Sequence, residues 1–139
     1  MDITDRLDIL DLISRYGHCY DEGDLDAMAD CFTADATFEI RGGIAGMPAV
    51  MEGREAIRQA MGARRASTAT AQRRHLITNA IVDADGPHRA RTASYLLLGS
   101  TVEGSLHLPV TGRYADVVVR DGGRWRFAER VLTMDGAIA

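Results

Sequence analysis

The spacing of apolar residues changes near residue 72, and this change limits the folds that the chain can adopt. Before it, apolar side chains recur every three or four residues, which is typical of amphipathic helices. After it, four long segments have the composition and alternation of half-buried strands, and short turn sequences rich in glycine and aspartate separate them. These segments span residues 73–83, 89–102, 106–120 and 124–134. Helices followed by a strand meander predict an α+β fold in which the sheet packs on the helices.

The first half of the chain predicts three helices and one short strand. Thr4 is the expected N-cap of the first helix, and Leu7, Leu10 and Ile13 are expected on its apolar face. We expect the long strands to curl round this helix as a strongly curved, mainly antiparallel cone with an internal pocket. The expected elements are helices over 4–20, 24–31 and 53–65 and a strand over 36–41.

Length and charge limit the domain organisation and the partners. A chain of 139 residues is the size of one domain, so residues 1–139 are expected to fold as a single unit. The net charge of −4 and the lack of a basic cluster argue against a nucleic-acid partner. No apolar run approaches the length of a membrane span, and the acidic start is unlike a signal peptide. We therefore expect a cytoplasmic protein that binds neither nucleic acid nor membrane.

The composition also limits the chemistry. All 16 basic residues are arginine, which excludes a Schiff base on a lysine side chain. Cys19 and Cys31 lie in helical segments and are expected to be reduced, buried thiols. His18, His88 and His107 match no zinc-ligand spacing and are expected at the surface, and no phosphate-binding loop is present. The sequence therefore predicts neither a metal nor a cofactor.

Asp21 and His75 are the main candidates for chemistry. Asp24 is the better cap for the second helix, which leaves Asp21 without a structural role. His75 lies at the start of the first long strand, and alternation is expected to place Asn79 on the same inward face. A carboxylate that holds an imidazole in one tautomer makes a general base. In the alternative interpretation, both residues are ordinary polar side chains with local hydrogen bonds.

Four tyrosines and Asn79 complete the candidate site. Tyr16 and Tyr20 lie one helical turn apart on the apolar side of the first helix, where most tyrosines are core residues. Tyr20, next to Asp21, is the expected third catalytic residue. The expected substrate-binding residues are Asn79, Tyr16, Tyr95 and Tyr114, with both later tyrosines facing inward.

Several segments resemble SnoaL-like proteins of the nuclear transport factor 2-like superfamily, whose members share a cystatin-like α+β cone. The similar segments are YDEGDLD at 20–26, FTADATF at 32–38, GREAI at 53–57 and DGGRWRF at 121–127. The resemblance extends over nearly the whole chain. It implies the fold and a homodimer, but this fold carries many unrelated functions.

Within the superfamily, the site pattern is similar to those of scytalone dehydratase and hexachlorocyclohexane dehydrochlorinase. Both have an aspartate just after the first helix and a histidine at the start of the first long strand, here Asp21 and His75, and the dehydrochlorinase motif His-x-x-Thr-Asn is present at 75–79. The resemblance implies that His75 is the base and that Asp21 orients it. A second catalytic tyrosine of scytalone dehydratase is missing, and the base of ketosteroid isomerase aligns with Ile40, which cannot take a proton.

The leading hypothesis is a cofactor-independent lyase of the dehydratase or elimination type. Its substrate would be a small, largely apolar molecule, cyclic or polyketide-like. One alternative is an isomerase or cyclase that uses the same dyad. Another is a non-catalytic module for small-molecule binding or dimerisation.

Overall fold

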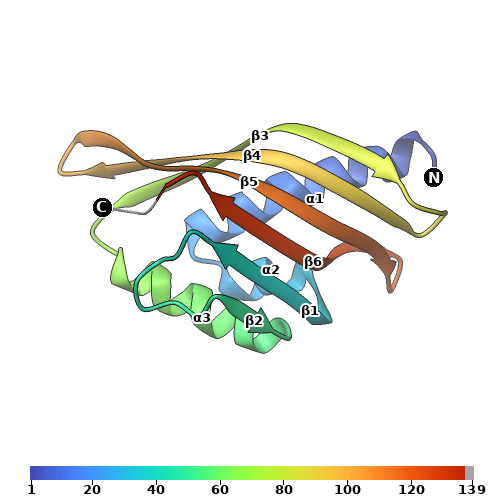
Figure 1. The fold of residues 1–139 in the computed structure, drawn as a ribbon, viewed down its shortest axis with the longest axis horizontal. Coiled ribbons are helices and arrows are strands. Elements are labelled where there is room, and N and C mark those ends of the chain that lie inside the picture. The colour runs from blue at the N-terminus through green and yellow to red at the C-terminus, as the bar shows by residue number, and fades with distance from the viewer. Residues whose placement is uncertain (137–139) are drawn as a thin grey trace.

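The computed structural model describes residues 1–136, and in this part of the chain three helices pack on one six-stranded sheet (Figure 1). The strand order is β2-β1-β6-β5-β4-β3, and β1 runs parallel to β6 while the other neighbours are antiparallel. The elements are α1 (Ile3–Glu22), α2 (Leu25–Asp30), β1 (Phe32–Arg41), β2 (Val50–Glu52), α3 (Arg54–Ser67), β3 (Gln72–Ala84), β4 (Arg89–Val102), β5 (Ser105–Asp121) and β6 (Arg124–Met134). The predicted α+β layout with three helices is confirmed.

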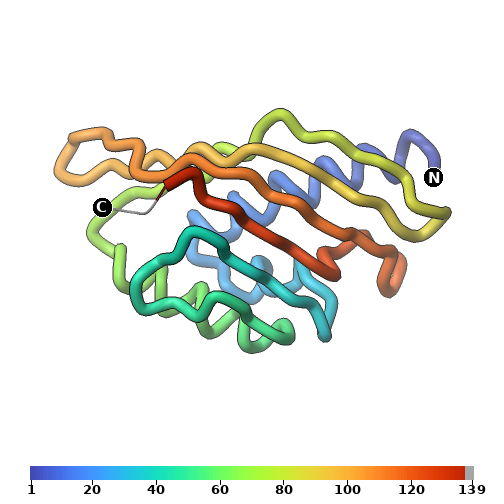
Figure 2. The backbone as a smooth tube through the Cα atoms, in the orientation of Figure 1, coloured from blue at the N-terminus to red at the C-terminus, as the bar shows by residue number. Residues whose placement is uncertain are grey.

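The second half of the chain forms the predicted meander. Strands β3 to β6 follow one another across the sheet, and each begins and ends within one residue of its expected bounds. The β4–β5 hairpin extends past the rest of the sheet at one end (Figure 2). Strand β1, far earlier in the sequence, joins beside β6, so the last strand of the chain lies inside the sheet. The short strand β2 at the sheet edge was not predicted.

Helix α1 crosses one face of the sheet and contributes its buried side chains from a narrow stripe. That stripe begins at Ile9, whereas Leu7 and Leu10, expected on the apolar face, are 57% and 38% exposed. Each residue adds about 100° around a helix, so Leu7 lies roughly opposite Ile9. The N-cap is Asp2 rather than Thr4: its side chain accepts from the main-chain N–H of Asp5 and the Asp5 carboxylate accepts from that of Asp2.

The centre of the core holds a buried ion pair between β5 and β6. Arg130 Nε lies 3.1 Å from Asp116 Oδ1, and both side chains are completely buried. The Thr92 hydroxyl donates to the second oxygen of Asp116 at 3.1 Å. Aromatic faces partly replace the hydration of the guanidinium. Three ring centres lie 3.7–4.4 Å from it, those of Tyr16, Tyr114 and Phe127.

The predicted internal pocket is not confirmed, because side chains fill most of the space between helices and sheet. A core cavity of about 30 Å³ remains near Tyr16, Tyr20 and His75. A volume of that size is close to that occupied by one water molecule. The buried ion pair and the aromatic rings round it account for much of the filling.

We predict that Asp116→Asn lowers the free energy of unfolding by about 3–5 kcal/mol, because it leaves the Arg130 charge buried without a counter-ion. Urea unfolding measures the change. The double variant Asp116→Leu/Arg130→Met should cost less than Asp116→Asn, since it replaces both charges by apolar groups.

Asp26→Asn is the matched control for this prediction. Asp26 pairs with Arg58 at the surface, where its side chain is 84% exposed, so its loss should cost about 1 kcal/mol or less. Equal effects of the two asparagine substitutions would contradict the role assigned to the buried pair.

Candidate functional site

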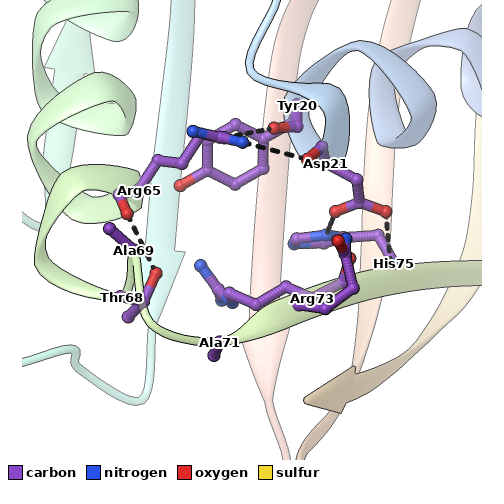
Figure 3. Close-up of a pocket in the computed structure, with 9 residues that line it drawn as sticks. Tyr20, Asp21, Arg65, Thr68, Ala69, Ala71, Arg73 and His75 are labelled. Carbon is purple, nitrogen blue, oxygen red and sulfur yellow. Dashed lines mark hydrogen bonds and ion pairs between the residues drawn. The ribbon is translucent and has the colours of Figure 1, made fainter. Parts of the chain in front are cut away.

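The end of α1 and the start of β3 meet at Asp21 and His75 (Figure 3). Asp21 Oδ1 lies 2.6 Å from His75 Nδ1, and Asp21 Oδ2 accepts a 2.8 Å hydrogen bond from the His75 main-chain N–H. The Asp21 and His75 side chains are 7% and 6% exposed. The structure thus brings together the two residues that the sequence singled out, 54 positions apart.

A carboxylate in this position determines which ring nitrogen of His75 carries a proton. Asp21 Oδ1 can only accept, so in the neutral ring Nδ1 is protonated and Nε2 keeps a lone pair. Nε2 makes no hydrogen bond with any residue of 1–136. This is the geometry of a general base whose orienting carboxylate also stabilises the imidazolium.

Gly17 allows α1 to approach β3 closely enough for this contact. A Cβ atom at position 17 would lie 3.3 Å from the main-chain oxygen of His75 and 3.5 Å from its Cβ. Gly17 is one helical turn before Asp21, so a larger side chain there would push the end of the helix away from the strand. The glycine therefore helps to set the distance at which Asp21 reaches two positions on His75.

Arg65 of α3 holds the last turn of α1 in place. Its guanidinium donates to the main-chain oxygens of Tyr20 and Asp21 at 3.1 and 3.2 Å (Figure 3). Carbonyls in the last turn of a helix need such partners from outside. Gly23 ends the helix with a φ of +79°, and a Cβ there would lie 2.7 Å from the Arg65 guanidinium carbon. Glycine alone combines this left-handed conformation with the absence of a side chain that would collide with Arg65.

Tyr20 lies against the dyad, but its hydroxyl proton is already engaged. The ring centre is 5.2 Å from that of His75, and the hydroxyl donates to the main-chain oxygen of Met61 at 3.0 Å. Burial raises the pKa of this hydroxyl, and nearby positive charges, first that of Arg73, oppose the shift. In this arrangement Tyr20 packs beside the His75 ring, and its catalytic role stays a prediction.

Two cavities meet at Tyr20, Arg73 and His75. One is the core cavity of about 30 Å³. The other, of about 130 Å³, lies on the polar side of the dyad. Pockets for drug-sized ligands are typically about 300–1,000 Å³, so the polar cavity has room for a small fragment in this form. The polar side chains that line it, besides the dyad and Tyr20, are Arg65, Thr68, Gln72 and Arg73.

Arg64 and Arg73 also face the site, although the sequence analysis did not single them out. Arg73 precedes His75 by two positions in β3, so alternation places both on the inner face. Arg64 lies in the last turn of α3 and lines the core cavity next to His75. Alternation along β3, which led to the prediction for Asn79, also places Arg73 on the face of His75.

Tyr16 and Tyr114 face inward, as expected, and are 1% and 2% exposed. Both line the core cavity, and the Arg130 guanidinium lies 4.4 and 3.7 Å from their ring centres. Burial raises the pKa of Tyr114 to about 12 and that of Tyr16 well above its usual value, so both hydroxyls stay protonated at neutral pH. Their contact with a substrate stays a prediction.

Asn79 and Tyr95 do not face the site, and their predicted orientation is wrong. Between Thr78 and Ile81, β3 contains one extra residue relative to β4, and Asn79 adopts a left-handed φ of 56°. Such a bulge changes which residues face inward beyond it. Asn79 therefore lies exposed on the outer face, the side of the sheet away from α1. Tyr95, which pairs with Thr78, is 58% exposed on the same face.

Within residues 1–136, no group of three histidine, cysteine, aspartate or glutamate side chains is arranged to hold a metal ion. Cys19 and Cys31 are free thiols, and burial raises the pKa of Cys31 to about 11, which keeps it protonated. His18, His88 and His107 are exposed, as expected. None of the helices in the same range is long and apolar enough to cross a membrane.

Several solved structures share this architecture. An NTF2-like protein with a cystatin-like fold from Novosphingobium aromaticivorans has a TM-score of 0.83 at 24% identity, over 96% of this chain and 83% of that chain. Aln2 from a Streptomyces species has a TM-score of 0.84 at 27% identity, over 97% and 94%. A protein from Catenulispora acidiphila, solved in complex with S-DNPA, has a TM-score of 0.79 at 28% identity, over 94% and 92%. No curated protein sequence matches the chain significantly.

The sequence itself carries the signature of one domain family. The SnoaL-like domain matches residues 1–131, which include every helix and all strands except the last residues of β6. The resemblance first noted in short segments is thereby confirmed over almost the whole chain. The chain belongs to the SnoaL-like family.

Proposed function

We propose that the protein is a cofactor-independent lyase of the elimination type, with His75 as its general base and Asp21 as the group that orients it. The observation that carries the proposal is the buried 2.6 Å contact between Asp21 and His75 beside a polar cavity. The chain belongs to the SnoaL-like family. The Catenulispora relative binds the small molecule S-DNPA. A small, largely apolar molecule is accordingly the proposed substrate.

The proposed step begins at Nε2 of His75. This atom takes a proton from a carbon next to a carbonyl, and the electron pair of that C–H bond forms the new double bond. The leaving group departs with the electrons of its own bond, and the imidazolium then gives its proton to the departing oxygen or to solvent. Asp21 stabilises the imidazolium while it exists.

The substrate needs more room than the core cavity offers. Ile44 and Met47, from the loop between β1 and β2, cover one side of that cavity. A Cβ at Gly43 or Gly46 of the same loop would meet no other atom within 4 Å, so both glycines face open space. We propose that this loop shifts outward when a ring-sized substrate reaches His75.

The small volume of the core cavity favours a second candidate, a non-catalytic binding module. In that case a ligand would occupy the polar cavity without being converted, and the dyad would serve only to join α1 to β3. An isomerase or cyclase with the same dyad is a third candidate. Product mass separates it from a lyase, since isomerisation releases no water or other leaving group.

We predict that Asp21→Asn reverses the tautomer of His75. The His75 main-chain N–H must donate, so it selects the amide oxygen of the new side chain and turns the NH₂ group toward Nδ1. Nδ1 must then accept, and Nε2 becomes protonated and can no longer act as a base. Long-range ¹H–¹⁵N NMR spectra of the histidine rings at a pH where they are neutral distinguish the two forms.

Asp24→Asn is the matched control for the tautomer measurement. It changes an aspartate three positions away whose side chain caps α2. The Asp24 variant should keep the Nδ1-protonated form of His75. The same form in Asp21→Asn would contradict the orienting role of the carboxylate.

We predict that His75→Gln lowers turnover by roughly two to four orders of magnitude, because a positioned general base contributes about that much. The assay screens small cyclic β-hydroxy ketones for loss of water, followed by the absorbance of the conjugated product. His18→Gln, an exposed histidine on α1, serves as the control and should keep full activity. Undiminished turnover in His75→Gln on a confirmed substrate would overturn the mechanism.

We also propose a homodimer formed through the outer face of the sheet. Ile81 and Tyr95 are each 58% exposed there, although large apolar groups are usually covered.

We predict that Tyr95→Arg/Ile81→Arg converts a dimer to a monomer in sedimentation-velocity experiments. Leu7→Arg, a residue of similar exposure on α1, should leave the dimer intact. A wild-type monomer at micromolar concentration would refute this assembly.

A further inference from the structure

Arg64 and Arg73 are partly buried at the site, and each has one buried side-chain nitrogen without a hydrogen-bond partner in residues 1–136. The Nε atom of Arg64 and one Nη atom of Arg73 are inaccessible to solvent and make no hydrogen bond with residues 1–136. Neither side chain forms an ion pair with a carboxylate in that range, whereas Arg58 and Arg74 do. A buried donor without an acceptor destabilises a fold, which makes two of them beside one cavity unusual.

The charges round the dyad do not balance. Arg64, Arg65 and Arg73 contribute three positive charges. Among residues 1–136, Asp21 is the one carboxylate that lines the two cavities, and it is engaged by His75. The chain as a whole has a net charge of −4, so this local excess does not reflect a basic composition. Burial and the charge of Arg73 lower the pKa of Arg64, because both disfavour its charged form.

Ordinary structural roles explain only part of this cluster. Arg65 satisfies the carbonyls at the end of α1, and cations in the last turn of a helix are favoured by its dipole, which suits Arg64. Arg73 lies in a strand and gains nothing from a helix dipole. In Figure 3 its guanidinium points away from Asp21 and His75 and into the space beside the Tyr20 ring.

We propose that Arg64 and Arg73 bind a carboxylate carried by the substrate. This inference rests on the proposed function and names the class of substrate: an organic acid with an acidic C–H bond a few bonds from its carboxylate. Two guanidinium groups offer the paired N–H donors that match a carboxylate. The aliphatic and aromatic side chains of the core cavity, Ile40, Leu96 and Leu98 among them, would take the apolar remainder.

The spacing along β3 links this anchor to the base. Inward-facing residues two positions apart in a strand have backbones about 6.6 Å apart. Arg73 and His75 line the same two cavities, so one small molecule could contact both side chains. Tyr20 cannot serve this purpose while its hydroxyl donates to Met61. In the proposed site, the two arginines therefore supply the anion-binding donors.

The test compares benzoate with benzamide, which has nearly the same shape but no charge. Titration of the wild-type protein is followed through the arginine side-chain Nε–Hε signals in ¹H–¹⁵N spectra. Benzoate should shift the signals of Arg64 and Arg73 and bind more weakly as sodium chloride is added, while benzamide should bind more weakly than benzoate and show no dependence on salt. Equal responses to the two compounds would overturn the proposal without the need for any variant.

Substitutions locate the binding site. Arg73→Gln and Arg64→Gln should each weaken benzoate binding about tenfold or more. Arg113→Gln is the matched control, because Arg113 lies on the outer face, and among residues 1–136 it too has no ion-pair partner. An equal loss in the control, or no loss in the two site variants, contradicts the proposal. If inorganic phosphate bound more tightly than benzoate, the arginines would form a phosphate site, and this result would also contradict the proposal.

Failure of this inference can be told apart from failure of the proposed function. A benzoate site together with undiminished turnover in His75→Gln would refute the lyase mechanism alone. Lost turnover in His75→Gln together with equal responses to benzoate and benzamide would refute the carboxylate anchor alone.

Discussion

The site depends on one carboxylate that accepts two hydrogen bonds from the same residue. Asp21 binds both the main chain and the ring of His75, so one side chain fixes the end of α1 to the start of β3 and sets the ring orientation. Gly17 permits the close approach of helix and strand, and Arg65 holds the last turn of α1 from α3. Three elements, α1, α3 and β3, thereby determine where Nε2 lies.

The buried ion pair explains why the site lies at the edge of the core. Arg130 and Asp116 occupy the centre with the aromatic rings that surround the guanidinium, so little space remains there for a ligand. A buried ion pair contributes little net stability, although loss of one partner is costly. Its clearer effect is on shape, because it leaves the polar rim between α1, α3 and β3 as the place where a substrate can meet His75.

Sequence periodicity predicted the elements well because burial repeats with the period of each structure, as in β3 to β6. Asp21 became a candidate for a different reason: Asp24 was the better cap for α2, and the structure shows that Asp24 does cap this helix. Periodicity failed where strands contain an extra residue: the bulge in β3 turned Asn79 outward. In β6, Trp125 and Phe127 are buried, and the next buried side chain is that of Arg130, just after a register shift. Simple alternation from Phe127 would place Arg130 on the exposed face, so the sequence pattern did not reveal a buried arginine there. Simple alternation cannot reveal a bulge, whose position depends on the partner strand.

In the proposed carboxylate site, the arginines matter more than the tyrosines for specificity. Tyr16 and Tyr114 are packed against Arg130, so they shape the cavity wall. Arg64 and Arg73 have buried donors with no acceptor in the described protein, and such donors gain the most when a ligand supplies one. A neutral amide of the same shape offers one oxygen acceptor and no charge, so it would satisfy these donors less well than a carboxylate does. Under the proposed function, the arginines would discriminate an acid from its neutral analogue, and His75 would remove the proton.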